Sequence, residues 1–188
     1  MLNSMKKWLF PFGMAFLLQI TSVAVSRADA VMGLEGLFPG GDTENALGVF
    51  LVDINPDADW AWFADGYTSG PVDEADHHYD HSLDEHALND PVTDRKRFLT
   101  GFHIGTAYRL SDRFSGFAGL GWMWEEDIVY LKDTTGLLAD GGTYSLEDET
   151  QSGFSISAGV LYHVEKVCFK AGYVSGADGF SLGMGLRF

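Results

Sequence analysis

Apolar and polar residues alternate without interruption along the last nine positions of the chain. One face of an extended segment there would carry Phe180, Leu182, Met184, Leu186 and Phe188, and the other would carry Ser181, Gly183, Gly185 and Arg187. Successive side chains of a β-strand point to opposite faces of the sheet. The pattern therefore predicts a strand with one apolar face and one small or polar face, ending on an aromatic residue.

The same period of two recurs upstream. It predicts eight strands, at about 31–38, 45–54, 58–68, 96–110, 114–126, 151–164, 167–175 and 180–188. Strands of about ten residues with this alternation are typical of transmembrane β-barrels, and eight strands make the smallest common closed barrel. The segment 45–54 is apolar on both faces, so the pattern does not assign its orientation.

The connections between these segments alternate in length. Short turns at 55–59, 111–113 and 165–166 alternate with linkers near 39–44, 69–95, 127–150 and 176–179. Outer-membrane barrels have short turns on the periplasmic side and longer loops outside. The parity therefore predicts an all-β, eight-stranded, antiparallel, up-and-down transmembrane β-barrel whose N- and C-termini are both periplasmic.

Aromatic residues gather near the predicted strand ends. The expected periplasmic group is Trp60, Trp62, Tyr108, Tyr162 and Phe188, and the expected outer group is Phe38, Trp122, Trp124, Tyr173 and Phe180. Aromatic rings are enriched at the two membrane–water interfaces. A soluble barrel, which would point its apolar face inward, is disfavoured because glycine and charge occupy the opposite face.

The N-terminal region has the features of a secretory signal. Lys6 and Lys7 precede an apolar stretch, and Ala28 and Ala30 flank Asp29 as small residues do at a cleavage site. We expect residues 1–30 to be a cleaved signal peptide and residues 31–188 to form the barrel. The alternative is an uncleaved membrane helix, which Pro11 and Gly13 would interrupt.

Charge excludes one class of partner. Removing residues 1–30 takes away Lys6, Lys7, Arg27 and Asp29, so the formal net charge changes from −15 to −17. Nucleic acid is excluded by that charge. The sole cysteine, Cys168, has no partner for an internal disulfide, and we expect it to pack inside the barrel.

The mature chain resembles the small eight-stranded bacterial outer-membrane barrels, the OmpA transmembrane-domain and OmpX-like group. The features that carry this resemblance are the signal peptide, the number of strands, the alternation of short and long connections and the terminal Phe188. The resemblance implies the outer membrane of a Gram-negative bacterium. It also implies contact with membrane lipid and lipopolysaccharide, and insertion by the barrel-assembly machinery through the terminal strand. The group contains adhesins, anchors, narrow pores and lipid-modifying enzymes, so it does not select one function.

The predicted inward face contains charged residues of both signs: Glu35, Asp65, His103, Arg109, Glu125, His163, Lys170 and Arg187. We expect them to pair as a plug that fills the barrel, with a narrow ion path as the alternative. A lipid-A-modifying enzyme is another alternative. Deacylases of that type use a His-x-Ser pair, which this chain lacks, so we name no catalytic residue and no cofactor-binding residue.

The linker 69–95 is unusually rich in histidine and acid. His77, His78, His81 and His86 lie among seven carboxylates, and imidazole with carboxylate suits a divalent metal such as zinc. A solvated acidic loop is the alternative. The linker 127–150 is also acidic, and the two together would allow calcium-bridged contact with an anionic surface.

Three consecutive basic residues, Arg95, Lys96 and Arg97, lie at the outer end of the fourth predicted strand. They would contact lipopolysaccharide phosphates or pair with the acidic loops. The sequence as a whole predicts a non-enzymatic barrel that acts through its acidic outer loops on an extracellular ligand or surface, or as structural support of the membrane.

Overall fold

A computed structural model describes residues 30–54, 58–70, 77–79, 89–138 and 141–188. Eight strands form a barrel: β1 (Ala30–Phe38), β2 (Ala46–Asp53), β3 (Trp60–Thr68), β5 (Val92–Arg109), β6 (Phe114–Lys132), β7 (Thr143–Val164), β8 (Val167–Val174) and β9 (Gly179–Arg187). A short strand, β4 (His77–Tyr79), lies outside the barrel, and a 3-10 turn, η2 (Ser175–Ala177), precedes β9.

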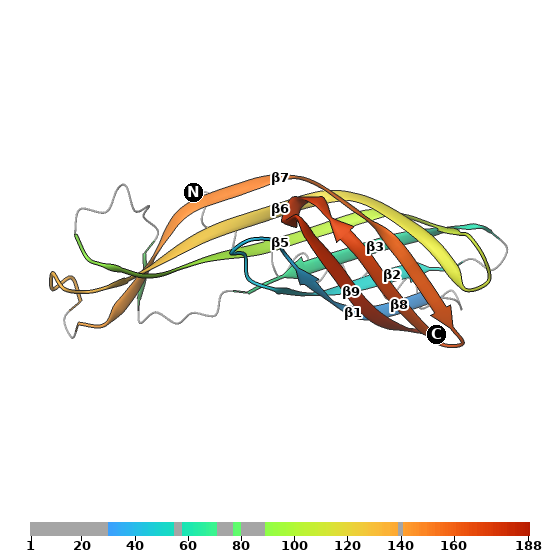
Figure 1. The fold of residues 1–188 in the computed structure, drawn as a ribbon, viewed down its shortest axis with the longest axis horizontal. Coiled ribbons are helices and arrows are strands. Elements are labelled where there is room, and N and C mark those ends of the chain that lie inside the picture. The colour runs from blue at the N-terminus through green and yellow to red at the C-terminus, as the bar shows by residue number, and fades with distance from the viewer. Residues whose placement is uncertain (1–29, 55–57, 71–76, 80–88, 139–140) are drawn as a thin grey trace.

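Each barrel strand pairs antiparallel with its neighbours in chain order. The circle is closed by the first and last strands, whose register runs from Val31 opposite Arg187 to Phe38 opposite Phe180. Figure 1 shows β1 and β9 side by side across this closure. The predicted fold, a closed up-and-down antiparallel barrel of eight strands, is confirmed.

Side chains of both apolar and polar residues fill the interior of the barrel, and its outer surface is apolar. Along β9, Ser181 is fully buried, whereas its neighbour Leu182 is 56% exposed. In β2, which the sequence left unoriented, Phe50 and Val52 are buried inside and Leu47 is 77% exposed. The aliphatic surface that faces outward is the surface that lipid covers in a transmembrane barrel.

Aromatic rings lie near both ends of this apolar surface. Trp60 and Tyr108 pack with ring centroids 4.6 Å apart, near the short turns. Tyr173 and Phe180 pack 5.8 Å apart near the opposite rim. These pairs come from the two predicted aromatic groups, and most members of both groups are exposed on the outside.

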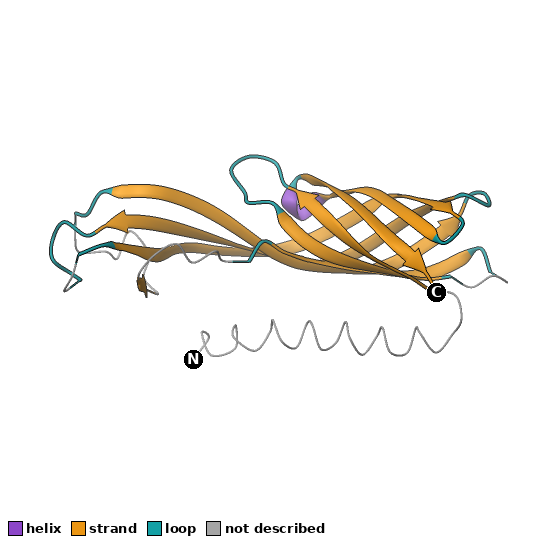
Figure 2. Cartoon of the chain, turned by 90° about the horizontal axis from the view of Figure 1, so that it is seen from below, coloured by secondary structure: helices purple, strands orange, loops and turns teal. Residues whose placement is uncertain are grey.

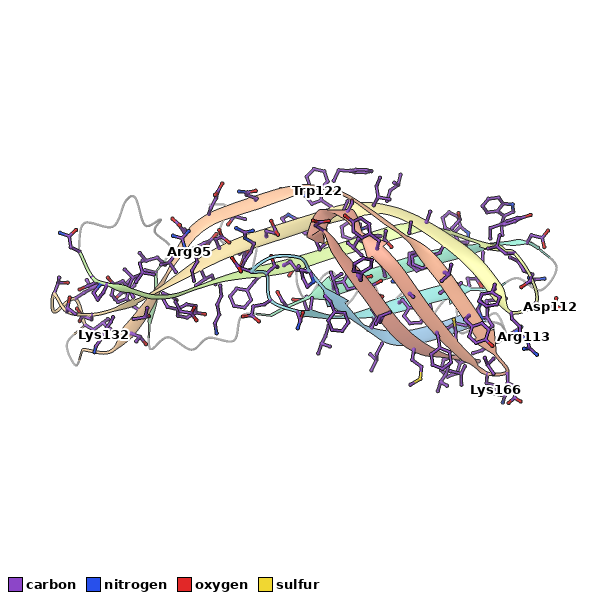
Figure 3. All side chains as sticks on the ribbon, in the orientation of Figure 1. Arg95, Asp112, Arg113, Trp122, Lys132 and Lys166 are labelled. Atoms are coloured by element: carbon purple, nitrogen blue, oxygen red, sulfur yellow. The ribbon has the colours of Figure 1, made fainter. Side chains whose placement is uncertain are left out.

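We call the end with the short turns and the C-terminus proximal, and the opposite end distal. Figure 3 labels Asp112, Arg113 and Lys166 in the proximal turns, and Arg95 and Lys132 far beyond the distal rim. The two longest connections, at 69–91 and 133–142, lie at the distal end, and the connections at 110–113 and 165–166 at the proximal end are short, as predicted. The distal connection at 175–178 is as short as the one at 110–113.

Three strands continue well beyond the barrel. β5, β6 and β7 are 18, 19 and 22 residues long, and their distal parts form a projecting three-stranded sheet that we call the arm (Figures 1 and 2). The arm differs from the sequence prediction, which placed residues 92–95, 127–132 and 143–150 in loops. Charged residues in these segments hide the strand pattern, and cross-strand pairing such as Asp127 with Glu149 keeps them extended.

The arm also contains the one parallel pairing between named strands of the described residues. β4 runs alongside β7, with His77 opposite Tyr144 and Tyr79 opposite Leu146. The predicted signal peptide lies outside the described residues except for Ala30, which begins β1. Within the described ranges, no helix has the length and apolar character needed to cross a membrane.

An arginine placed on the apolar outer surface tests whether lipid covers it. Leu182 pairs with Gly36 and Ala171 in the middle of its strand. We expect Leu182→Arg to lower the free energy of unfolding in lipid vesicles by about 2–4 kcal/mol, because the charge must enter hydrocarbon. Leu137→Arg, at an exposed site between β6 and β7, should have little effect. Equal effects from the two variants, measured by denaturant titration, would contradict a lipid-covered barrel.

Candidate functional site

A buried polar cluster occupies the distal half of the lumen. It lies between two apolar layers, one around Phe50, Phe63 and Phe117 and one around Leu37, Leu99 and Met123. Its members come from five strands and are all buried: Glu35, Asp65, Tyr67, His103, Ser155, Ser157 and Lys170. Strand register brings them together, since Asp65 lies directly opposite His103 on β3 and β5.

Lys170 is the centre of this lumen cluster. Its Nζ donates to Glu35 Oε2 at 2.5 Å, to Asp65 Oδ2 at 2.7 Å and to Tyr67 Oη at 2.9 Å. The ammonium also lies 5.0 Å from the ring centroids of Phe63 and Phe117, within the range of a cation–π contact. A buried charge is tolerated only with such partners, so Lys170 holds four strands to one point.

A second set of bonds leaves the other oxygen of Asp65. Asp65 Oδ1 lies 2.7 Å from His103 Nδ1, and His103 Nε2 lies 2.9 Å from Ser155 Oγ. The backbone N–H of Gly176 donates to the same Ser155 Oγ at 3.0 Å. Ser157 donates to Asp65 Oδ2, the oxygen that also accepts from Lys170, at 3.1 Å. The chain of bonds therefore runs from the ion pairs to the distal rim at η2.

The predicted inward residues divide into two groups. Glu35, Asp65, His103 and Lys170 meet in the lumen cluster and confirm the predicted pairing of opposite charges. The remaining four are only half-buried and lie elsewhere: Arg109, Glu125, His163 and Arg187. His163 Nε2 lies 3.4 Å from Ser115 Oγ, and Glu125 lines a cavity at the distal rim.

Cys168 is buried inside the barrel, as expected. It belongs to the apolar layer around Phe50, Phe63 and Phe117, which lies on the proximal side of the lumen cluster.

Three members of the lumen cluster were not selected from the sequence. Tyr67, Ser155 and Ser157 all occupy inward positions of strands whose alternation was recognised. Alternation gives the face that a residue occupies but not its height in the barrel. The height depends on register between strands, which places Asp65 of β3 opposite His103 of β5.

The arm has a small core of its own. Val129, Leu131, Tyr144 and Leu146 are fully buried there, and Leu138 and Tyr79 pack against them. Burial of these side chains outside the barrel shows that the arm is a packed structure rather than a pair of loops.

Asp90 ties the start of β5 to the connection between β6 and β7. Oδ1 accepts from the backbone N–H of Thr134 at 2.8 Å and from its hydroxyl at 2.7 Å, while Oδ2 accepts from Tyr144 Oη at 2.9 Å. Desolvation opposes ionisation of Asp90, but these bonds and one from Thr135 outweigh it and hold the pKa of Asp90 well below its usual range.

Three basic residues of the arm, Arg95, Lys96 and Arg97, have acidic partners. Arg97 Nε lies 2.7 Å from Asp127 Oδ1, Arg95 pairs with Asp148 at 3.3 Å, and Lys96 lies 3.9 Å from Asp94. Of the two roles expected from the sequence, pairing with the acidic segments is the one that this geometry supports.

The four predicted metal ligands are not brought together within the described residues. The backbone of His77 and His78 belongs to β4, whereas His81 and His86 lie outside the described ranges. Among the described residues, no group of three or more histidine, cysteine, aspartate or glutamate side chains is arranged to hold a metal ion.

A cavity of about 230 Å³ lies at the distal rim of the barrel. Pairing between β7 and β8 ends at Ser157 and Val174, and the cavity lies just beyond that point. Its lining includes Met123, Phe154 and Gly176.

No protein-family model matches the chain, and no curated protein matches it either. Similar solved structures include Ail, the attachment invasion locus protein of Yersinia pestis, at 13% identity and a TM-score of 0.48, covering 85% of this chain and 97% of that one. They also include the N-terminal β-barrel domain of Pseudomonas aeruginosa OprF, at 12% identity and a TM-score of 0.46, covering 86% and 98%. Neisserial surface protein A has 16% identity and a TM-score of 0.38, covering 85% and 93%.

Removing the buried ammonium should destabilise the barrel strongly. We expect Lys170→Met to lower the free energy of unfolding by about 3–5 kcal/mol, because Glu35 and Asp65 would be left as buried charges without their cation. Lys166→Met, at an exposed turn position, removes the same charge without that consequence. Denaturant titration of both variants in detergent measures this difference. Similar unfolding midpoints for the two variants would contradict the role of Lys170 in stabilising the lumen cluster.

The Asp90 hydrogen bonds should make the arm sensitive to acid. The pKa of Asp90 is lower in the folded arm than its ordinary value of 3.8, so its stabilisation is present above that pH and is lost as the pH falls through the folded value. We expect the Thr134 amide to exchange hydrogen faster in Asp90→Asn than in the wild type at pH 6. The difference should shrink at lower pH. Equal exchange at pH 6 would contradict this role, and the Ser157 amide in the barrel serves as the internal reference.

Proposed function

We propose that this protein resides in the outer membrane of a Gram-negative bacterium and acts by presenting the arm at the cell surface. In this proposal residues 1–30 are removed on export, both termini are periplasmic, and the distal end is extracellular. The observation that carries it is the arm, a packed sheet that extends β5, β6 and β7 beyond the apolar surface of the barrel. The ion-paired lumen cluster supports an occluded barrel rather than a pore.

The partners that we propose for this protein suit the surfaces of its barrel and its arm. The apolar exterior suits membrane lipid and the lipid chains of lipopolysaccharide, and the alternating β9 suits recognition by the barrel-assembly machinery. On the arm, acidic residues outnumber basic ones, and Arg95, Lys96 and Arg97 are already paired with acids. One Ail structure holds the heparin analogue sucrose octasulfate. An acidic arm suits a basic partner better than such a polyanion.

A second proposal concerns divalent metal. β4 places the backbone of His77 and His78 beside β7, so the histidine-rich segment begins against the arm. Zinc held by His77, His78, His81 and His86, or calcium held by the nearby carboxylates, would join that segment to the acidic face and make surface contact depend on the metal.

Surface labelling tests the orientation on which the main proposal depends. Leu137 is 44% exposed at the arm tip, and the native Cys168 is buried. We expect Leu137→Cys to react with a membrane-impermeant maleimide on intact cells, whereas Asp112→Cys in a proximal turn should react only after permeabilisation. The opposite pattern would show that the arm faces the periplasm and would overturn the proposal.

Zinc titration tests the second proposal. Calorimetry on the purified protein should show stoichiometric binding that disappears when His77, His78, His81 and His86 are all changed to alanine. His163→Ala should bind zinc like the wild type, since that half-buried histidine lies at the proximal end of the barrel. Absence of binding by the wild type would rule out the zinc site.

A further inference from the structure

Ser155, His103 and Asp65 form one continuous hydrogen-bonded chain across β7, β5 and β3. The two links measure 2.9 Å from Ser155 Oγ to His103 Nε2 and 2.7 Å from His103 Nδ1 to Asp65 Oδ1. All three side chains are buried in the lumen. A hydroxyl next to an imidazole that is oriented by a carboxylate is the arrangement that activates a serine nucleophile.

The surrounding contacts are compatible with one arrangement of protons in this chain of hydrogen bonds. Lys170 Nζ compensates the charge of Asp65 through Oδ2, which leaves the carboxylate as an acceptor toward His103 through Oδ1. His103 Nδ1 then donates to Asp65, and in the neutral form of the ring Nε2 presents a lone pair to Ser155. Because Gly176 N–H donates to Ser155 Oγ, the serine hydroxyl is free to donate to His103. This tautomer is the one that a general base requires.

Ser155 also lies just beyond the point where pairing between β7 and β8 ends. It is two residues beyond the last pair between β7 and β8, and η2 bridges the gap through the Gly176 bond and a 2.8 Å bond from the Ile156 N–H to Ser175 Oγ. The cavity of about 230 Å³ is lined by Gly176, which makes this contact, and by Phe154, which precedes Ser155 in the chain. A side chain at position 176 would collide with Ser155 and Met123, so glycine permits this close approach.

The geometry points to a latent acyl-transfer site in which Ser155 is the nucleophile, His103 the general base and Asp65 the residue that positions His103. The substrate class is a carboxylic ester of a membrane amphiphile, because the gap lies at the aromatic rim near Tyr173 and Phe180, where the ester groups of such molecules reside. The cavity is smaller than the roughly 300 Å³ or more of typical ligand pockets, so it suits the reacting end of one acyl chain. This activity goes beyond the proposed surface role and does not depend on it.

The reaction balances with groups already present. Ser155 Oγ bonds to the ester carbonyl carbon while its proton moves to His103 Nε2. The bond from that carbon to the alcohol oxygen then breaks, and His103 returns the proton to the leaving alcohol. Water, activated by His103 in the same way, releases the acid and restores the serine. In the closed barrel Ser155 is fully buried, so entry requires its hydrogen bond to Gly176 to open toward the cavity.

A small fluorophosphonate tests this site directly. We expect diisopropyl fluorophosphate to modify Ser155 in the detergent-purified protein, with the phosphorus–oxygen bond formed as fluoride leaves and His103 takes the hydroxyl proton. Mass spectrometry should locate one adduct on the Ser155 peptide of the folded wild type and none after thermal unfolding. No adduct on the folded wild type would overturn the proposal.

Variants separate an activated serine from a merely buried one. Ser155→Ala should abolish labelling, and His103→Gln, which keeps an amide for hydrogen bonding but has no base, should slow it about a hundredfold or more. Ser181→Ala removes another fully buried lumen serine and should label like the wild type. Equal labelling rates in His103→Gln and wild type would show that the imidazole does not activate Ser155. If circular dichroism shows that His103→Gln does not fold, the comparison of labelling between native and unfolded wild type still tests whether the folded structure activates Ser155.

Discussion

The need to pair every backbone N–H and C=O group in lipid governs this structure. Hydrocarbon offers no hydrogen bonds, so a sheet that crosses it has to close on itself. Here the closure depends on β1 and β9, which pair along nearly their whole lengths from Val31 opposite Arg187 to Phe38 opposite Phe180. A barrel of eight strands leaves inside only the width that side chains can fill. At Gly121, for example, a β-carbon would collide with the carbonyl oxygen of Phe102, so the narrow wall itself demands glycine there.

The narrow lumen then determines how its polar residues behave. Lys170, Glu35 and Asp65 are shut away from solvent, and each depends on the others for its hydrogen bonds. The rings of Phe63 and Phe117 approach the same ammonium, so apolar and ionic packing meet at one atom. One consequence is that His103 has a fixed orientation, because the carboxylate beside it is held from the other side by Lys170. Stability of the barrel and chemistry at Ser155 therefore depend on the same set of contacts.

Sequence reasoning succeeded where a single strand carries the whole signal. The terminal segment alternates residue by residue, and Ser181 and Leu182 lie on the predicted opposite faces. It was less successful where burial or proximity depends on contacts between strands. Residues 128–131 are consecutive and apolar. All four are buried, because other side chains of the arm pack against each face of its sheet. Likewise, nothing along β7 marks Ser155 as a neighbour of His103, which is 52 residues away in the sequence. Register across strands supplies that information, and a period of two within one strand does not.

The continuity of β5, β6 and β7 has a mechanical consequence. Each strand runs from the proximal half of the barrel to the arm without a linker, and β5 and β6 remain paired from Arg109 opposite Ser115 to Val92 opposite Leu131, apart from one shift in register near Val92. A pull on the arm tip along the strand axis would therefore load many inter-strand hydrogen bonds together in shear, instead of opening them one at a time. Tension applied outside the membrane would be transmitted to the barrel wall at β5 and β7, the strands that carry His103 and Ser155.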